Sequence, residues 1–299
     1  MAKPVIEQQR QRRVRDRPLD DPALALDRAD RVPRAATGNL TLPLGIAALA
    51  LIIFLLAPIV ALVWRASGER GKFTDQTWET LRQALTLTLI TSGITLCIVL
   101  VLGTPLAYLL ARRRFRGAQL INTLVDLPMV LPPAVAGIAL LMAFGRRGLI
   151  GAQLDRIGIT VGFTAAAVVM AQTFVSVPFY IRAARAGFSR VSLDLEEAAA
   201  DLGASPARVL RTITLPLARS SLAAGAVLAW ARAVGEFGAT IMFAGNFPGR
   251  TQTMPLAIYG RYEAGDLDTA LLLAALLLAA SMLVLLAVRL IGGRAGDLA

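Results

Sequence analysis

The hydrophobic residues of this chain are gathered into long runs rather than spread evenly among polar residues. A helix needs about 20 apolar residues to cross the hydrocarbon core of a bilayer. Six runs qualify: residues 41–64, 85–111, 119–144, 161–181, 220–244 and 267–291. The runs are continuous and do not alternate with polar residues, which favours helices over the strands of a membrane barrel. The pattern predicts an all-α integral membrane protein with about six transmembrane helices.

The segments outside these runs define the domain plan. Residues 1–40 hold no apolar run and are rich in Arg, Asp and Pro, so we expect a cytoplasmic, disordered tail. The tail has nine Lys/Arg and six Asp/Glu, and so mild an excess favours a topology signal over nucleic-acid binding. A transmembrane domain over 41–291 and a short cytoplasmic tail over 292–299 follow. The first run is too long and too far from Met1 to be a cleavable signal peptide, so we expect it to be retained.

Basic residues predict the side of the membrane on which each loop lies. With the N-terminus inside, the inner segments are 1–40, 112–118, 182–219 and the C-terminal end. These segments carry 21 Lys/Arg, and the outer loops carry nine. We therefore expect both termini in the cytoplasm.

Composition removes several kinds of chemistry. Only 17% of the residues are charged, the net charge is +11, and there is no histidine. Sites that need histidine, such as His-ligated zinc, haem or a Ser-His pair, are therefore excluded. Cys97 is the single cysteine, which excludes an intrachain disulfide and a Cys-rich metal site. The chain is expected to bind no metal or cofactor of its own, which indicates transport or anchoring rather than enzymatic catalysis.

The inner segment from about 190 to 216 has the signals of two short helices. Ser192 can cap the first helix, whose first turns are acidic, and Gly203 lies where a helix ends with a left-handed residue. Ser205 can cap a second helix that ends near Pro216. The pattern predicts a helix–turn–helix at the membrane surface.

Seven residues of this segment have the spacing of the EAA loop of ABC-importer permeases, which the chain resembles over about residues 41–291. They are Glu197, Ala198, Ala199, Gly203, Ile213, Leu215 and Pro216. In that family the loop couples the permease to a separate ATPase. The resemblance therefore implies the type I permease architecture, a homodimer, and two copies of an ATPase that uses ATP and Mg²⁺.

The chain has no phosphate-binding loop of its own. The sequence Gly71-Lys72-Phe73 lacks the Ser or Thr that such a loop requires after its lysine. The protein is therefore predicted to be a transport subunit and not an enzyme.

Residues 235–259 resemble one branch of the same family. Gly235-Glu236-Phe237-Gly238 is followed from Asn246 to Leu256 by the pattern N-x-P-G-x-T-x-T-x-P-L, which is similar to that of molybdate permeases. Sulfate/thiosulfate permeases share part of this pattern, and tungstate importers are hard to separate. The resemblance implies a molybdate path in a bacterial plasma (inner) membrane, fed by an extracytoplasmic oxyanion-binding protein that supplies most of the selectivity.

Polar residues within or next to the fifth run are candidates for the path itself. Arg232 and Glu236 lie four residues apart on one predicted helix face. They either line the path, with Glu236 repelling anions in the closed state, or neutralise each other structurally. The candidate path residues are Arg232, Gly235, Glu236, Phe237, Gly238 and Thr240.

Other charged and bent positions leave alternatives open. The outer-loop arginines either attract an oxyanion or are solvated loop charges; they are Arg146, Arg147, Arg156, Arg250 and Arg261. The prolines between 128 and 133 are expected to bend the third run, with or without a role in the path. Asp126 in that run is equally ambiguous.

Two functions of other classes compete with the permease. A secondary anion transporter coupled to an ion gradient would use Asp126 and Glu236 as carriers, but it would have no ATPase for the EAA loop to bind. An intramembrane protease would need a catalytic base, and the chain has neither histidine nor visibly paired carboxylates at matched depth.

Overall fold

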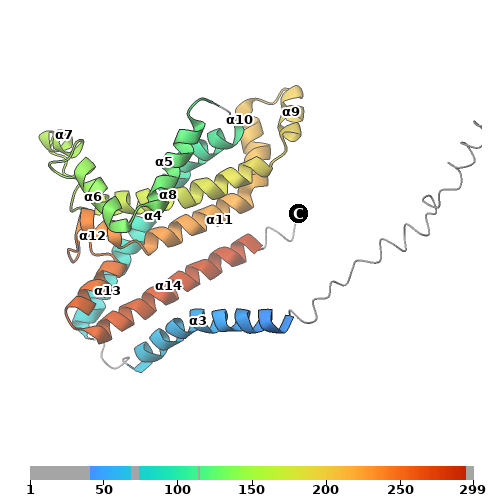
Figure 1. Ribbon diagram of the computed structural model, residues 1–299. Helices are drawn as coiled ribbons and strands as arrows, with labels where there is room; N and C mark the ends of the chain where they lie inside the picture. Colours follow the sequence, from blue (N-terminus) through green and yellow to red (C-terminus); the bar gives the residue numbers. More distant parts are fainter. Residues whose placement is uncertain (1–40, 69–73, 114, 294–299) are drawn as a thin grey trace, which may run out of the picture. The chain divides into compact units, whose positions relative to one another are not determined.

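The computed structural model describes residues 41–68, 74–113 and 115–293, and all regular structure in these ranges is helical (Figure 1). The chain divides into two units, residues 1–60 and 61–299. The predicted tail over 1–40 lies outside the described residues. Most of the predicted C-terminal tail does too, although its first two residues belong to the last helix, which ends at Gly293.

The first two predicted spans are single helices. Helix α3 runs over Thr41–Gly68 and α4 over Asp75–Arg112. Helix α4 begins ten residues before the apolar run because Thr74 caps it, accepting a hydrogen bond from the backbone N–H of Thr77 at 3.1 Å.

The third predicted span is two helices rather than one. Helix α5 (Ala118–Val130) and α6 (Pro133–Phe144) meet at an angle of 118°. Pro132 and Pro133 lack the N–H groups that a continuous helix needs at this point, so the chain turns between them. The proline cluster predicts the bend, but not its size. A short helix α7 follows over Gly151–Arg156.

The fourth predicted span is shifted toward the coupling loop. Helix α8 covers Ala165–Arg190, so it begins four residues after the expected start and extends nine past the expected end. Next come α9 (Leu193–Asp201), α10 (Pro206–Val209), a π-helical turn η2 (Leu210–Thr214) and α11 (Leu215–Val234). The first part of the predicted 182–219 loop is therefore the end of α8.

The fifth predicted span is broken, since α11 ends at Val234 and α12 covers only Gly238–Ala244. Helices α13 (Met254–Glu263) and α14 (Leu267–Gly293) complete the chain. Within the described ranges, four helices are long and apolar enough to cross a membrane, or five if the bent pair counts as one. A shorter apolar stretch, Leu267–Leu283, lies in α14. The predicted number of six spans is therefore approximate.

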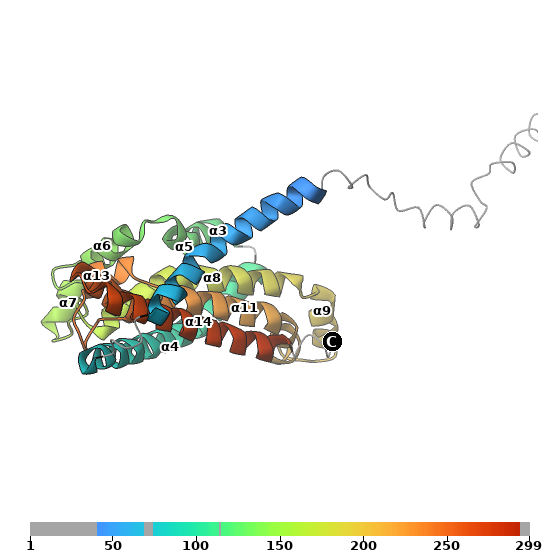
Figure 2. The same cartoon turned by 90° about the horizontal axis from the view of Figure 1, so that it is seen from below.

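Helix α8 is the packing centre of the unit formed by residues 61–299. One cluster of buried side chains joins it to α4 and α11, and includes Val99, Tyr180, Phe188 and Ala229. A second cluster joins it to α6 and α12. Figures 1 and 2 show α8 and α11 side by side, with α9 and α7 at opposite ends of this unit. The core thus holds the predicted coupling loop at one end.

Candidate functional site

The two-helix structure expected in the coupling loop is present, and its caps are the expected ones. Oγ of Ser192 accepts a hydrogen bond from the backbone N–H of Asp194 at 3.2 Å, at the start of α9. Oγ of Ser205 accepts from the N–H of Arg208 at 3.4 Å, and Pro206 takes the first position of α10. Each helix therefore begins where its hydroxyl cap predicts.

Gly203 makes the turn between these helices. Its φ is +85°, a conformation that costs other residues energy because of the Cβ atom. The N–H of Gly203 donates to the carbonyl of Ala200 at 2.9 Å, and that of Ala204 to the carbonyl of Ala199 at 3.0 Å. These two bonds are the Schellman motif that ends a helix on a left-handed residue. The direction of α10 after α9 therefore depends on this position.

The outward surface of α9 is both apolar and acidic. Leu193, Leu195 and Leu202 are exposed, Leu202 by 91%. Glu197 is also exposed, and so is Ala198, while Ala199 is half-buried. Exposed apolar side chains grouped on one short element are typical of a protein-binding surface. We call the outward residues of 193–202 the α9 surface.

The second loop helix does not end near Leu215-Pro216, and this prediction is wrong. Helix α10 continues through η2 into α11, and Pro206–Val234 forms one apolar helical stretch. The N–H of Leu215 donates to the carbonyl of Leu210, five residues back, which is the pattern of a π turn. This wider turn accommodates Pro216, whose ring would otherwise meet the carbonyl four residues earlier. Ile213, Leu215 and Pro216 thus lie at the entry to a span.

Glu196, not Glu197, holds α9 against the ends of α4 and η2. Its Oε1 accepts hydrogen bonds from Nη2 of Arg112 and from Oγ1 of Thr214, both at 2.7 Å. Sequence reasoning used Glu196 only as an acid near a helix start and Arg112 only as a topology charge. Adjacent helical residues point about 100° apart, and no local signal indicates which of the two glutamates turns inward.

Arg232 and Glu236 are paired, but they do not share one helix face as expected, because α11 ends at Val234 and Glu236 lies in the break before α12. Nη1 of Arg232 lies 2.6 Å from Oε2 of Glu236, and their side chains are 30% and 1% exposed. The other carboxylate oxygen of Glu236 accepts from the backbone N–H of Ala239 at 2.7 Å, in the first turn of α12. Both oxygens of Glu236 therefore have structural partners, which favours the neutralised-pair alternative.

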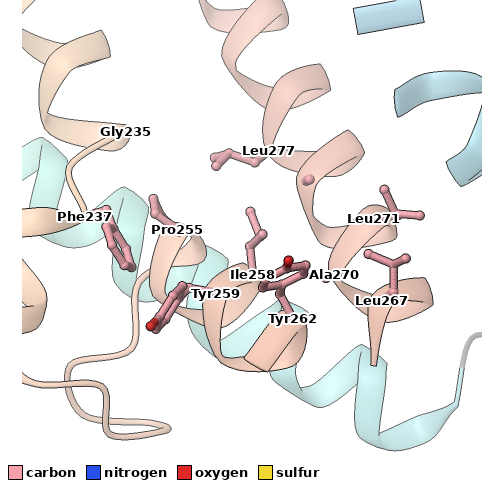
Figure 3. Close-up of a pocket in the computed structure, with 11 residues that line it drawn as sticks. Gly235, Phe237, Pro255, Ile258, Tyr259, Tyr262, Leu267, Ala270, Leu271 and Leu277 are labelled. Carbon is pink, nitrogen blue, oxygen red and sulfur yellow. The ribbon is translucent and has the colours of Figure 1, made fainter. Parts of the chain in front are cut away.

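The remaining candidate path residues divide between two environments. Thr240 is buried, and its Oγ1 has no hydrogen-bond partner within the described ranges. A Cβ added to Gly238 would lie 2.5 Å from Cβ of Pro133, so a glycine is needed where α12 approaches α6. Gly235 and Phe237 line an apolar cavity of about 530 Å³ (Figure 3).

This cavity lies between the helix break, α13 and α14. Figure 3 shows the Phe237 and Tyr259 rings close together at one side, and their centroids are 4.9 Å apart. Apart from the two tyrosines, the lining side chains are apolar, and the Tyr259 hydroxyl already donates to Glu263. Such a cavity lacks the charged donors that an oxyanion site needs.

Within the segment that resembles molybdate permeases, residues 245–253 between α12 and α13 form a loop folded on itself. Oγ1 of Thr251 accepts from the N–H of Phe247 at 3.1 Å and donates to the carbonyl of Gly245 at 3.3 Å. Nδ2 of Asn246 donates to the carbonyl of Leu256 at 3.1 Å. Asn246 and Thr251 therefore maintain the shape of the loop, whereas Oγ1 of Thr253 has no hydrogen-bond partner within the described ranges.

Two of the outer-loop arginines have carboxylate partners. Nε of Arg146 lies 3.1 Å from Asp155, and Nη1 of Arg261 lies 3.5 Å from Asp266. The hydrogen bond from Arg146 is the main cause that lowers the pKa of the Asp155 carboxyl below its ordinary value. Arg146 is thus an exposed loop charge, as the second alternative expects, whereas Arg261 lies in α13, is 24% exposed and also donates to Thr80.

Known proteins resemble the chain over most of its length. It is 43% identical over 241 residues to the molybdenum transport system permease protein ModB of Mycobacterium tuberculosis, covering 81% of this chain and 90% of that protein. It is 34% identical over 268 residues to the sulfate transport system permease protein CysT of Salmonella typhimurium, covering 88% and 96%.

The fold resembles solved transporters as well. The crystal structure of a bacterial alginate ABC transporter, in complex with a periplasmic protein bound to an alginate pentasaccharide, matches with a TM-score of 0.68 at 17% identity. The match covers 86% of this chain and 95% of that one. The family model for the inner membrane component of binding-protein-dependent transport systems matches residues 103–295. The chain therefore belongs to the family of binding-protein-dependent transport system inner membrane components.

Proposed function

We propose that this protein forms the transmembrane path of a molybdate importer driven by ATP hydrolysis on a separate subunit. The 43% identity to a molybdenum transport permease over 81% of the chain carries the proposal. The 34% identity to a sulfate transport permease makes sulfate the second candidate. Tungstate has the chemistry of molybdate and is expected to share its path.

The ATPase is proposed to bind the α9 surface. Its exposed leucines offer apolar area, and Glu197 adds negative charge at its edge. A groove that is apolar in the middle and basic at its rim would complement it. Each permease chain offers one such surface, so the proposed complex holds two permease copies and two ATPase copies. ATP and Mg²⁺ are proposed to bind only to the ATPase.

The proposed orientation has both termini in the cytoplasm. Arg112 and Glu196, both from segments predicted to be inside, are joined by an ion pair. Gly249 and Gln83, both from segments predicted to be outside, are close neighbours. Helices α7 and α9 lie at opposite ends of their unit (Figure 2). The pairing of segments supports the assignment.

The break at 235–237 is the proposed location of the path within each copy. Arg232 is its partly exposed cation, with Glu236 fixing the break and Gly238 allowing α12 to approach α6. Gly235, Phe237 and Thr240 complete the proposed set. A path of this kind needs no tight oxyanion site if selection occurs in the extracytoplasmic binding protein.

Reconstitution tests the substrate. In vesicles that hold the complex with its ATPase, the binding protein loaded with molybdate is expected to stimulate ATP hydrolysis and uptake of molybdate. Binding protein loaded with tungstate should act similarly. If sulfate stimulates and molybdate does not, the sulfate candidate replaces the proposal. Uptake that follows an ion gradient without ATP would instead support the secondary transporter.

Cysteine labelling tests the orientation. In a Cys97→Ser background, Ser205→Cys is expected to react with an impermeant maleimide only from the cytoplasmic side. Gly249→Cys is expected to react only from the outside. Labelling of both positions from one side would mean that the chain does not cross the membrane through α11 and α12, and the reversed pattern would mean that the distribution of arginines assigns the wrong sides.

A further inference from the structure

Glu196 joins three segments that are far apart in the sequence. Arg112 is the last residue of α4, Glu196 lies in α9, and Thr214 ends the turn that leads into α11. Both Arg112 and Thr214 bond to the same oxygen of Glu196 at 2.7 Å. Nη2 of Arg112 also donates to the carbonyl of Val191 at 3.1 Å, in the link between α8 and α9. We call Arg112, Glu196 and Thr214 the α4–α9 junction.

The junction is sheltered from water, unlike the other long-range ion pair on this side. The side chains of Arg112 and Glu196 are 9% and 13% exposed, whereas those of Arg182 and Asp126 are 57% and 36% exposed. Exposed pairs contribute little because water screens them. Removing one partner of a sheltered pair leaves an uncompensated charge, so the Arg112–Glu196 contact is hard to break without consequence.

The junction gives α9 a connection that the backbone does not provide. Along the chain, α9 is attached to α8 on one side and, through α10 and η2, to α11 on the other. Helix α4 is linked to α9 only through side chains. Without Arg112, a displacement of α9 would reach α4 only indirectly, through the packing of α4 against α8 and α11.

Helix α4 leads from the junction to the outer loop region. Its 38 residues extend over about 57 Å at 1.5 Å per residue. Near its other end, Oγ1 of Thr80 accepts from Nη2 of Arg261 at 2.7 Å, and Oγ1 of Thr88 accepts from the N–H of Met254 at 2.8 Å. One continuous helix thus contacts the coupling loop at one end and the 245–261 region near the other.

We propose that Arg112 and Glu196 are positioning residues that transmit displacement of the coupling loop to α4, and through α4 to the outer region at 245–261. This role rests on the proposed function, because it assumes that an ATPase moves α9. It differs from docking, since the α9 surface faces away from the junction. Breaking this contact should leave the ATPase bound but lower the number of anions transported per ATP hydrolysed.

The test measures the number of anions transported per ATP hydrolysed in the reconstituted complex. Arg112→Gln and Glu196→Gln are each expected to lower this ratio at least about fivefold, the lower end of usual coupling between sites. Binding of the ATPase should not change. The double variant should be no worse than the poorer single variant, because both changes break one contact. Arg113→Gln removes the same charge one residue away, at an exposed position, and should behave like the wild type.

The possible failures can be told apart. An unchanged ratio in Arg112→Gln, or a double variant whose loss is the product of the single losses, would overturn the junction. Loss of ATPase binding in both single variants would also overturn it, because the residues would then serve only to fold the loop. If the wild type carries sulfate and not molybdate, the substrate proposal fails, and the ratio is measured with sulfate.

Discussion

Replacing Gly203 by valine is expected to lower uptake about five- to thirtyfold while membrane levels of the protein stay normal. A β-branched residue at φ +85° costs roughly 1–2 kcal/mol, and about 1.4 kcal/mol corresponds to a factor of ten in binding. The strain is relieved if the turn opens, which moves α10 relative to the α9 surface. ATP hydrolysis by the isolated ATPase should be unaffected. The measurements are uptake in vesicles and retention of the ATPase on the purified permease.

Two further variants serve as controls. One tests the left-handed backbone conformation at position 203, and the other tests a glycine of similar φ at a distant position. Gly203→Asn should remain close to wild type, because asparagine tolerates the left-handed region. Gly158 has φ +79° and open space around it, as Gly203 does, but follows α7 at the opposite end of the unit. Gly158→Val should therefore lower uptake much less. Wild-type uptake by Gly203→Val would show that this turn does not transmit the action of the ATPase.

Replacing Glu236 by alanine is expected to destabilise the folded protein by about 3–5 kcal/mol, the usual cost of breaking a buried ion pair from one side. The substitution leaves Arg232 without its carboxylate and removes the acceptor for the N–H of Ala239. The break between α11 and α12 would then lose the group that fixes it. The thermal midpoint of the purified protein and its level in the membrane are the measurements.

Matched substitutions separate charge from hydrogen bonding at this position. Glu236→Gln keeps an acceptor for Ala239 and should lose less stability than Glu236→Ala. Glu263 is exposed and bonds to Tyr259, so Glu263→Ala should be nearly neutral. A Glu236→Ala protein as stable as the wild type would mean that the pair does not fix the break, and would reopen its role as an anion-repelling group.

Local rules predicted the coupling loop well because its structure is determined locally. Ser192, Gly203 and Ser205 each act on neighbouring backbone groups, so their positions in the sequence are sufficient to place the start of each loop helix and the end of the first. The end predicted for the second helix near Pro216 was wrong, because that helix continues into α11. The prolines at 132 and 133 likewise predicted a bend, because each lacks the backbone N–H that a continuous helix needs at its own position. The angle of 118° depends on packing against α12 and α8, which sequence periodicity does not contain.

Specific side-chain contacts, which the apolar pattern does not encode, account for what the sequence did not predict. The break at 235–237 contains no proline, and an apolar run with a single acid reads as one span. What fixes the break is the Glu236 carboxylate, which binds both Arg232 and the start of α12. The inward orientation of Glu196 depends on Arg112, 84 residues earlier, and no pattern of one segment indicates it.

Hydrogen exchange tests the central claim most directly, namely that the ATPase binds the α9 surface. Exchange of the backbone amides of the permease is compared with and without the ATPase, under conditions in which both are folded. The account expects slower exchange over residues 193–204 when the ATPase is present, and a smaller effect in Glu197→Lys. Unchanged exchange over 193–204 in a complex that still hydrolyses ATP and transports anion would contradict it.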